Sequence, residues 1–590
     1  MTFPCRGPER ILSAYEEDWI EQFMSRRASE STAPTSVFGE LSHRESGRSF
    51  ATWLGLLTFW MYPTPFSAPN GLLAQKAARE VSSRQMEERL PSGAVARLGP
   101  KGGADKGDSA AVVAVSRAGD LVAWTGRGRS EVYVWDRRSQ REFFRIDGFD
   151  GAVTALSFSH DGKLLGTGTL KGTVRLWDVQ QSHKKGIGTL ATGALFKHPP
   201  GLVKCIAFSP DGRSVAASGY YDEIVEEWDV SSSRERQRWS GGGGDAAWWI
   251  AFSPNGELLA ACFLSRGIRL WSDTNGSQVS RLYGHSGGVL QLAFAKSGGT
   301  LASCSNDGTV RLWDIRAGRE LWRIEVPKAV FASISFSSDD RMIASSEQTS
   351  GEICLWETLT HKPRLRFRVR PGTAGQVAFF PRGLELASAQ TDGTVVIWDA
   401  SGERIYGRRS ANRLSHRNLE RLWAELSGSD AERAYRAICA LAEGNREALA
   451  FLESRVHPVV PVGLDVVRKL VEQLDSRSFK DRENAAAELQ KLGEAAEPSL
   501  RTALRTANST EVRVSVERLL QRIDALRRNP DGVDLAQRRA VEALERMGTS
   551  EALSFLRRLA GGLAASPLSG DARAAIARLR PQDGGVTGNR

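Results

Sequence analysis

The sequence contains little cysteine, no long hydrophobic run and no block of one charge sign. Its 590 residues include six cysteines, which form neither a CxxC pair nor a regular framework. This spacing argues against a disulfide scaffold and a cysteine zinc site, and we expect buried free thiols. The net charge of +10 is spread thinly along the chain. Nucleic-acid-binding proteins concentrate basic residues on one face or tail, so we expect no nucleic-acid partner.

Catalytic and cofactor motifs are also missing. The chain has no HExxH, GxSxG, kinase or Walker sequence, and its eight histidines lack a second histidine or a cysteine at metal-ligand spacing. The glycines of GTGTLKGTVRLWD lead into an expected strand, whereas a phosphate-binding loop opens a helix. We therefore expect no catalytic residue, no cofactor and no metal, in a protein that is not an enzyme.

Tryptophan, in contrast, is abundant, with 16 residues. Seven of them lie in segments such as VRLWD and VVIWD, at intervals of 42 or 43 residues and one of 51. These repeated tryptophans are Trp135, Trp177, Trp228, Trp271, Trp313, Trp356 and Trp398. An alternating apolar run and a turn rich in Asp, Asn and Gly come before each, as in CIAFSPDGR. Each unit is therefore expected to form one four-stranded sheet.

A single four-stranded sheet cannot bury both of its faces, so the seven units must stack. Seven twisted sheets arranged radially form an all-β seven-bladed propeller, which we place at residues 93–400. The period and the WD dipeptides resemble the WD-repeat (WD-40) β-propeller family, and the following helical region makes the chain similar to large bacterial WD-repeat proteins. For the outer strand of the last blade we favour residues 94–98 over residues 404–406, because this pairing joins the two ends of the ring.

The resemblance implies a hydrogen-bonded set of Trp, Ser or Thr, Asp and His within a blade. The fifth unit matches this set in full, with His285, Ser303, Asp307 and Trp313. We interpret the set as structural, since each bond contributes about 1 kcal/mol, and we do not count His285 as catalytic. In four other units the aspartate is replaced, by Arg129, Lys171, Ser265 and Ser350. Those blades are expected to rely on packing.

The resemblance also implies a binding face beside the turn before the third strand and the start of the innermost strand. Alignment of the units places mainly apolar and aromatic residues there in blades two to five. The candidate partner-binding residues are Leu170, Lys204, Tyr221, Trp248, Leu264 and Leu290. This composition is typical of an interaction site. The alternative is that Trp248 and Trp249 pack between blades, and strand alternation predicts one of them buried and the other partly exposed.

Helical spacing replaces the β pattern after the propeller. We expect a linker at residues 401–417, a separate all-α domain at 418–580 and a disordered tail at 581–590. Two segments, DRENAAAELQKLGEAAEPSLRTAL and LAQRRAVEALERMGTSEALSFLRRLAGGL, are expected to form helix pairs, with Gly493 and Gly548 at helix C-caps. Such pairs resemble HEAT-like repeats, which stack as a solenoid.

The N-terminal region contains one apolar segment. We expect a disordered leader at residues 1–49, a signal or anchor candidate at 50–68 and a helical linker at 69–92. The stretch from Phe50 to Tyr62 carries no charge. It is shorter than the ~20 residues of a membrane-spanning helix but suits a signal peptide. Translation from Met1 or from Met24 is open. Export or membrane anchoring is favoured over a cytoplasmic location, with a buried or interfacial segment as the alternative.

Together these features predict a non-enzymatic scaffold that binds protein or peptide partners through the propeller face and the helical solenoid. One alternative is an exported envelope- or carbohydrate-binding propeller, with a mature N-terminus after about residue 68. The other is a lyase-type enzyme of the HEAT-like class, with a polar pocket of convergent titratable groups in the helical domain. The partner's identity and the oligomeric state do not follow from the sequence.

Overall fold

The computed structural model describes residues 90–579 apart from short gaps at 100–109, 127–129, 198–200, 220–222, 242–245, 265–266, 391–392, 407–413, 445 and 508. The expected leader, the apolar segment, most of the helical linker, Tyr221 and the tail lie outside the described residues. In the part of the chain that is described, no helix combines the length and the apolarity that a bilayer crossing requires.

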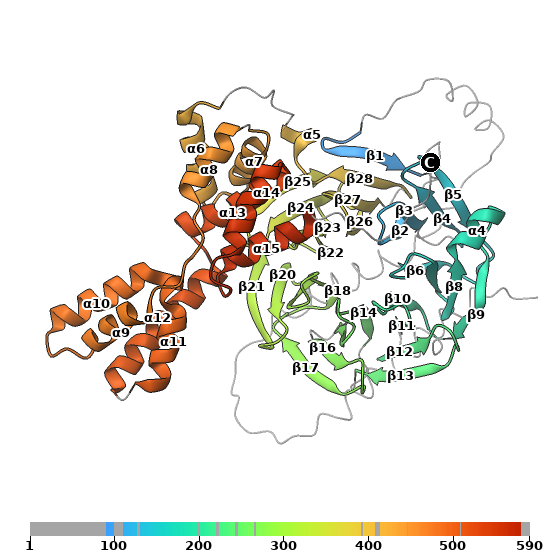
Figure 1. The fold of residues 1–590 in the computed structure, drawn as a ribbon. Helices are drawn as coiled ribbons and strands as arrows, with labels where there is room; N and C mark the ends of the chain where they lie inside the picture. The colour runs from blue at the N-terminus through green and yellow to red at the C-terminus, as the bar shows by residue number, and fades with distance from the viewer. Residues whose placement is uncertain are drawn as a thin grey trace, which may run out of the picture. The chain divides into compact units, whose positions relative to one another are not determined.

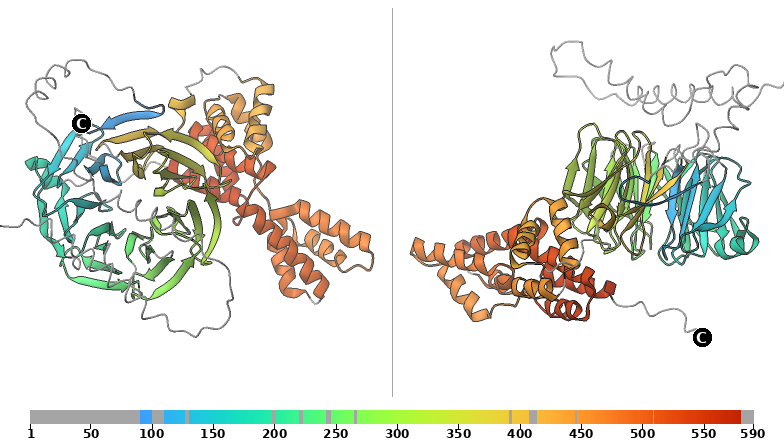
Figure 2. Two further views of the ribbon diagram at one scale, coloured as in Figure 1. Left: turned by 180° about the vertical axis from the view of Figure 1, so that it is seen from behind. Right: turned by 90° about the horizontal axis from the view of Figure 1, so that it is seen from above.

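Seven four-stranded antiparallel sheets stand around a ring, as Figures 1 and 2 show. The first strands contact one another around the axis of the ring. These innermost strands are β2 (Ala110–Val115), β6 (Val153–Phe158), β10 (Val203–Phe208), β14 (Ala247–Phe252), β18 (Val289–Phe294), β22 (Phe331–Phe336) and β26 (Ala374–Phe379). The second strands are β3 (Leu121–Gly126), β7 (Leu164–Thr169), β11 (Ser214–Gly219), β15 (Leu258–Phe263), β19 (Thr300–Ser305), β23 (Met342–Glu347) and β27 (Glu385–Gln390).

The outer half of each blade contains the repeated tryptophan. The third strands are β4 (Val132–Asp136), β8 (Thr173–Asp178), β12 (Ile224–Asp229), β16 (Gly267–Ser272), β20 (Thr309–Asp314), β24 (Glu352–Glu357) and β28 (Val395–Asp399). The outer strands are β5 (Arg141–Ile146), β9 (Leu190–Lys197), β13 (Glu235–Ser240), β17 (Gln278–Tyr283), β21 (Arg319–Glu325), β25 (Pro363–Arg368) and β1 (Ala94–Leu98). A short helix, α4 (Val179–Lys185), lies between β8 and β9. The predicted seven-bladed propeller is confirmed.

Strand β1 closes the ring. It pairs antiparallel with β28, so the last sheet has the order β1-β28-β27-β26 and contains both ends of the propeller sequence. The N-terminal closing strand predicted from the sequence is therefore confirmed. The alternative segment lies in a short helix, α5 (Glu403–Tyr406), within the stretch that was expected to be a linker.

Short-range hydrogen bonds from a serine and an aspartate stabilise the hairpin between the first and second strands. In blade three, the Ser209 hydroxyl donates to the Asp211 carboxylate at 2.6 Å and accepts the backbone N–H of Ser214 at 3.0 Å. Gly212 follows with a φ of 72°, a conformation that glycine adopts without steric cost. Corresponding hydrogen bonds recur at Ser159 and Ser337. The recurring Ser-x-Asp pattern thus fixes the turn and the register of the two strands that it joins.

The repeated tryptophans hold successive blades together. From blade two onward, each of the six packs in a hydrophobic cluster that contains side chains of the preceding blade. Trp177, for example, lies among Val112, Val134 and Phe144 of blade one. All six are buried, whereas Trp135 of blade one is half-buried. Removal of large apolar surface from water at each blade junction is the main force that stabilises the ring.

The region after the propeller is helical, as predicted. Its helices after α5 are α6 (His416–Ser427), α7 (Ala431–Ala442), α8 (Arg446–Arg455), α9 (Leu464–Gln473), α10 (Phe479–Leu492), η2 (Gly493–Ala496), α11 (Glu497–Thr506), α12 (Thr510–Arg528), α13 (Gly532–Met547), α14 (Ser550–Ala560) and α15 (Pro567–Leu579). Gly493 and Gly548 end α10 and α13 with positive φ angles. The two expected helix pairs, however, belong to different hydrophobic clusters, so these contacts do not show a HEAT-like stack.

Blade six and the helical region share one buried core. A single hydrophobic cluster contains Leu355 of β24 and Phe367 of β25 together with Tyr435 of α7 and Leu544 of α13. Figure 1 shows α7 and α13 beside these strands. The helical region is therefore not joined to the propeller by a flexible linker alone.

Buried ion pairs cross the same junction. Glu357 of β24 accepts hydrogen bonds from Arg364 of β25 at 2.6 Å and from Arg539 of α13 at 2.5 and 3.0 Å. Arg364 also pairs with Glu542 of α13 at 2.9 Å, and Glu542 pairs with Arg546 at 3.1 Å. Burial opposes ionisation of Glu357 and Glu542, yet the surrounding arginines lower the pKa of each to about 2. Both carboxylates remain charged, and each cation across the junction has a partner.

Candidate functional site

The hydrogen-bonded set of blade five is complete. The indole N–H of Trp313 donates to Ser303 Oγ at 2.8 Å, which lies 2.7 Å from Nε2 of His285. Nδ1 of His285 lies 2.9 Å from the Asp307 carboxylate. Burial opposes ionisation of Asp307, but the hydrogen bonds from His285 and Thr309 hold its pKa well below the usual value. Burial lowers the pKa of His285, so a neutral imidazole that donates through Nδ1 satisfies every member.

Among the residues that the structure describes, only part of this set recurs in other blades. The tryptophan of the third strand donates to a hydroxyl of the second strand in three further blades. These pairs are Trp177 with Thr167, Trp356 with Ser345, and Trp398 with Ser388. In blade four the residue at the position equivalent to Ser303 is Ala261, which has no hydroxyl. Blade five is thus the one described blade with the histidine, hydroxyl, aspartate and tryptophan all joined.

A β-bulge creates the candidate binding face. The register of each innermost strand shifts at its start, so the second residue has no direct partner on the neighbouring strand. In blades three, four and five these bulged residues are Lys204, Trp248 and Leu290, and all three are half-buried. The same edge of each blade carries the turn between the second and third strands. Leu170 in that turn of blade two is 53% exposed, and Leu264 of blade four is half-buried.

Contacts between blades organise this face. The ammonium of Lys204 lies 4.2 Å from the ring centroid of Trp248, a distance typical of a cation–π interaction. Leu264 packs against Gly288 of blade five, where an added Cβ would come within 3.2 Å of Leu264 Cδ2. We call the set of Leu170, Lys204, Trp248, Leu264 and Leu290 the mouth surface. Tyr221, the sixth predicted residue, lies outside the described residues.

The prediction for the adjacent tryptophans was wrong. Strand alternation predicted one buried and one partly exposed side chain, but Trp248 and Trp249 are both half-buried, so neither is buried as expected. The register shift between Ala247 and Trp249 interrupts the alternation at Trp248. Both rings also pack against the hydrophobic cluster between blades four and five. The bulge therefore directs Trp248 toward the edge of the sheet without removing it from the core.

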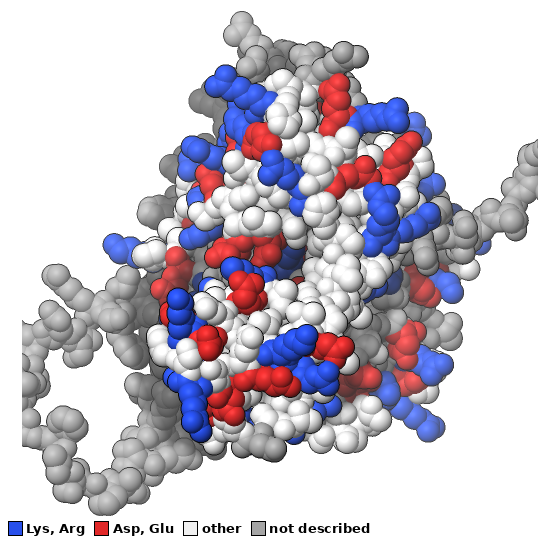
Figure 3. Space-filling model, turned by 60° about the vertical axis from the view of Figure 1, so that its left-hand side comes forward, with Lys and Arg blue, Asp and Glu red and all other residues white. Residues whose placement is uncertain are grey.

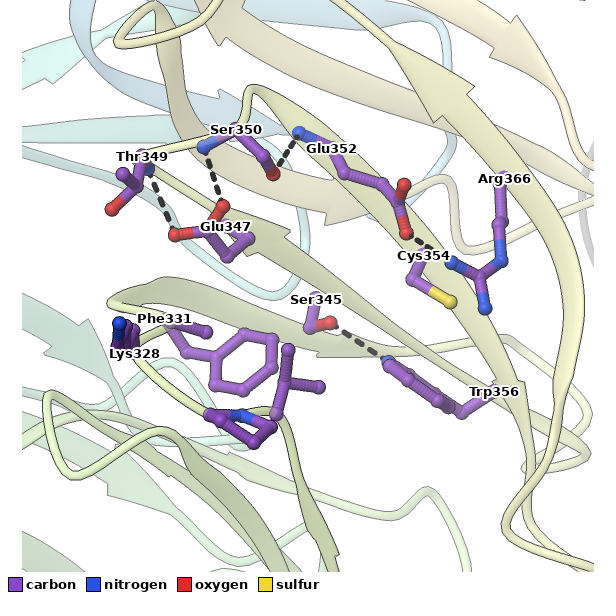
Figure 4. A pocket seen from close by; sticks show the side chains of 13 residues that line it. Lys328, Phe331, Ser345, Glu347, Thr349, Ser350, Glu352, Cys354, Trp356 and Arg366 are labelled. Carbon is purple, nitrogen blue, oxygen red and sulfur yellow. Dashed lines mark hydrogen bonds and ion pairs between the residues drawn. The ribbon is translucent and has the colours of Figure 1, made fainter.

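A cavity of about 470 Å³ on blade six was not predicted. Its lining comes from β22, β23, β24, β25 and the loop between β21 and β22 (Figure 4). Phe331, Ser345, Glu347, Cys354 and Trp356 form part of its wall. The sequence did hold a signal for it, because unit six lacks the Gly-His pair and has Ser350 in place of the turn aspartate.

The cysteines that the structure describes are free thiols. Cys205, Cys262, Cys304 and Cys354 are buried free thiols, as predicted, and Cys439 is partly buried. Burial raises the pKa of Cys205 to about 12. Among the residues that the structure describes, no group of three or more His, Cys, Asp or Glu side chains could hold a metal ion. On the face drawn in Figure 3, basic and acidic side chains are interspersed.

Four segments of the chain match the WD40 family, described as WD domain, G-beta repeat: residues 141–178, 190–229, 236–272 and 276–314. The chain carries WD40 repeats. Each match spans the outer strand of one blade and the first three strands of the next. This sequence unit ends in the strand that contains the repeated tryptophan.

Curated relatives align with part of this chain. Telomerase protein component 1 of Rattus norvegicus is 30% identical over 26% of this chain and 6% of its own length. Periodic tryptophan protein 2 homolog of Schizosaccharomyces pombe is 27% identical over 21% of this chain and 13% of its own length. Pre-mRNA-processing factor 19 homolog 2 of Arabidopsis thaliana is 29% identical over 26% of this chain and 27% of its own length. The chain thus spans less than a third of each relative.

Among solved structures, the β-propeller domain of Myceliophteria thermophila Cps50 (Swd1) aligns with a TM-score of 0.46 and 17% identity. This alignment covers 52% of this chain and 99% of that domain. The relatives named above come from eukaryotes, so the comparisons do not support the expected resemblance to bacterial proteins in particular.

Proposed function

We propose that this WD40-repeat protein is a non-enzymatic scaffold that binds a protein or peptide partner at the mouth surface of its propeller. The observation that carries the proposal is the placement of Lys204, Trp248 and Leu290 at bulges of three consecutive blades. Each bulge presents a side chain at the same edge of the ring, beside the turns that hold Leu170 and Leu264. In this proposal, these side chains from four blades together form the surface that a partner covers.

The chemistry of this surface suits a polypeptide. Aromatic and aliphatic side chains that are already half-buried lose little conformational entropy when a partner covers them, and they dominate the energetics of protein interfaces. The stacked ammonium of Lys204 adds one positive charge beside the aromatic ring. An acidic or hydroxyl group of the partner could pair with this ammonium while apolar groups cover Leu290 and Leu264.

The helical region supplies a second docking surface in this proposal. Several large apolar side chains of the α9–α12 part are exposed, in contrast to the buried cores around them. They are Leu464, Val466, Phe479 and Val514. Two binding surfaces on one chain raise the effective concentration of a bivalent partner and favour assembly. Membrane association or export through Phe50 to Tyr62 stays a prediction, because that segment lies outside the described residues.

Site-specific photo-crosslinking in the full chain tests the mouth surface. A photoreactive phenylalanine analogue at position 290 should form an adduct with a defined partner protein in native cells. The same analogue at position 283 is the matched control, because Tyr283 is 69% exposed on the outer strand of blade four. Mass spectrometry would identify the adduct, and the double variant Lys204→Glu, Trp248→Ala should abolish it. Equal adducts from positions 290 and 283 would refute the proposed face.

Stability must be measured in the same variants. Trp248 packs partly against the core between blades four and five, so Trp248→Ala alone should also lower the melting temperature. Lys204→Glu reverses a partly exposed charge and leaves that packing in place. Loss of the adduct in Lys204→Glu at an unchanged melting temperature would therefore assign the effect to binding.

A further inference from the structure

The cavity on blade six occupies the place where blade five holds two large polar side chains. The registers of the two blades correspond: Ser303 lies opposite Arg311 in blade five, and Ser345 lies opposite Cys354 in blade six. The buried guanidinium of Arg311 is therefore replaced by a thiol. Four residues before the innermost strand, blade five has His285 and blade six has Pro327. Two groups that fill blade five are thus missing from blade six.

The arrangement in blade five shows what this space can hold. Nη1 of Arg311 donates to Glu320 at 2.6 Å, and its Nε donates to Thr309 Oγ1 at 3.2 Å. An added Cβ on Gly284 would come within 2.5 Å of Nη1, so the loop that carries His285 lies directly over this guanidinium. A planar cation therefore fits between the outer strands of a blade and the loop that enters it from the preceding blade.

Blade six retains an anion for such a cation. Glu347 is 8% exposed and accepts backbone N–H groups of Val330, Thr349 and Ser350 at 3.1, 2.8 and 2.5 Å. Burial opposes its ionisation, but the hydrogen bonds from Ser350 and the other backbone groups bring the pKa of Glu347 below the ordinary value. In the described part of the chain, this carboxylate forms no ion pair. Figure 4 shows it between the turn at Thr349 and the ring of Phe331.

The other walls of the cavity complete a binding site. Ser345 Oγ accepts the indole N–H of Trp356 at 2.8 Å and lines the cavity. In blade five the corresponding serine hydroxyl also bonds His285. Phe331, which is 2% exposed, forms an aromatic part of the cavity wall. Glu352 is already paired with Arg366 at 2.7 Å, so Glu347 is the lining carboxylate left for an incoming positive charge.

We propose that this cavity binds the guanidinium group of an arginine side chain presented by a partner protein. The arginine would occupy the space that Arg311 fills in blade five, with its guanidinium on the Glu347 carboxylate and its methylene groups against Phe331. This site is independent of the mouth surface, because its residues come from blade six and the loop that precedes it.

Calorimetric titration of the full chain with N-acetyl-arginine methylamide tests the site without an identified partner. N-acetyl-citrulline methylamide is the matched probe, since citrulline has nearly the same shape but no charge. We expect the arginine probe to bind at least about tenfold more tightly, because hydrogen bonds to a charged group are the stronger ones. Glu347→Gln should weaken binding of the arginine probe by a similar factor. Equal affinity for the two probes, or no binding of the arginine probe, would overturn the proposal.

A second variant keeps the test valid if Glu347→Gln does not fold. Thr349 is an exposed turn residue at the rim, and its contact with Glu347 is made by the backbone N–H. Thr349→Lys should therefore fold and should repel the arginine probe, whereas Thr274→Lys in an exposed turn of blade four should not. Equal binding by the Thr349→Lys and Thr274→Lys variants would place the probe elsewhere and refute the site.

Discussion

Replacing Glu357 by glutamine removes the central anion of the junction between blade six and the helical region. Glu357 accepts four hydrogen bonds from the two buried guanidiniums of Arg364 and Arg539. Glutamine has nearly the same shape as glutamate but carries no charge. Its amide N–H₂ group would face the N–H donors of the two arginines. Arg364 would keep Glu542 as a partner. Arg539 would keep only the carbonyl groups of Leu426 and Gly428, each at 2.7 Å.

The size of the effect follows from the buried charge that would lose its partner and from the pKa of Glu357. Breaking a buried ion pair by removal of one partner costs about 3–5 kcal/mol, because the other charge stays buried without compensation. The pKa of Glu357 is about 2, compared with 4.5 for an ordinary glutamate. That difference corresponds to roughly 3 kcal/mol at neutral pH. We therefore expect Glu357→Gln to lower the free energy of unfolding by about 3–5 kcal/mol.

Urea unfolding followed by circular dichroism at 222 nm and by tryptophan fluorescence measures this change. The control is Glu352→Gln, which lies on the same strand and pairs with Arg366 and Arg368, whose side chains are 50% and 82% exposed. A pair of that kind contributes at most about 1 kcal/mol. In the wild type, helices and propeller should unfold in one transition. If Glu357→Gln shifts the midpoint no more than Glu352→Gln does, the junction does not depend on this anion and the reasoning is refuted.

The same network gives a pH dependence. The folded-state pKa of Glu357 and of Glu542 lies below the ordinary value, so each carboxyl stabilises the fold above about pH 4.5. This stability is lost as the pH falls toward 2. The loss between pH 4.5 and 2 should be clearly smaller in Glu357→Gln, and an identical acid-unfolding curve would contradict the assignment.

Three further changes test other parts of the fold. Asp307→Ala should lower the free energy of unfolding by about 1–3 kcal/mol, because it leaves His285 without its acceptor, and an unchanged urea midpoint would count against a structural role. Burial raises the pKa of Glu227 from 4.5 to about 7, so the fold loses stability as the pH rises from about 4.5 to 7 and changes little above that. Glu227→Gln should therefore be more favourable at pH 8 than at pH 5, by roughly 1–3 kcal/mol, and an equal effect at the two pH values would contradict the raised pKa. Gly351 and Gly372 both have a positive φ, so Gly372→Ala should lower the free energy of unfolding by about 1–2 kcal/mol. Gly351→Ala should lower it further, because an added Cβ would lie 2.5 Å from the carbonyl oxygen of Arg370. Equal melting temperatures of the two variants would contradict this.

The propeller could be predicted from the sequence because its information is short in range and repeated. The alternation in CIAFSPDGR, the Ser-x-Asp turn and the tryptophan at the end of the third strand each act within a few residues, and seven copies reinforce the same interpretation. Strand β1 was predictable for a related reason, since a ring with one missing strand needs an apolar alternating segment from one of its ends. The set of His285, Ser303, Asp307 and Trp313 could be named because the resemblance to the WD-repeat family implies it and the fifth unit matches it in full.

The bulge and the cavity were harder to predict because they arise from pairing between strands. Alternation in the sequence cannot show that the register shifts at Trp248, so the orientation of the two adjacent tryptophans was predicted wrongly. The space on blade six depends on which side chain faces Ser345 across the sheet, and only the observed register identifies that residue as Cys354. Missing histidine and aspartate residues in unit six indicated a change, but not a hollow beside a buried Glu347.

By itself, the sequence determined the number of blades and the helical character of the C-terminal region, and it favoured the strand that closes the ring. Each depends on local periodicity or on turn chemistry, which a single chain records directly. Only the tertiary structure decided that Glu357 and Arg364 of blade six face Arg539 and Glu542 of α13. These charges lie more than 170 residues apart in the chain. In the sequence they are indistinguishable from solvated surface charges, because burial and pairing between distant segments follow from packing rather than from any local pattern.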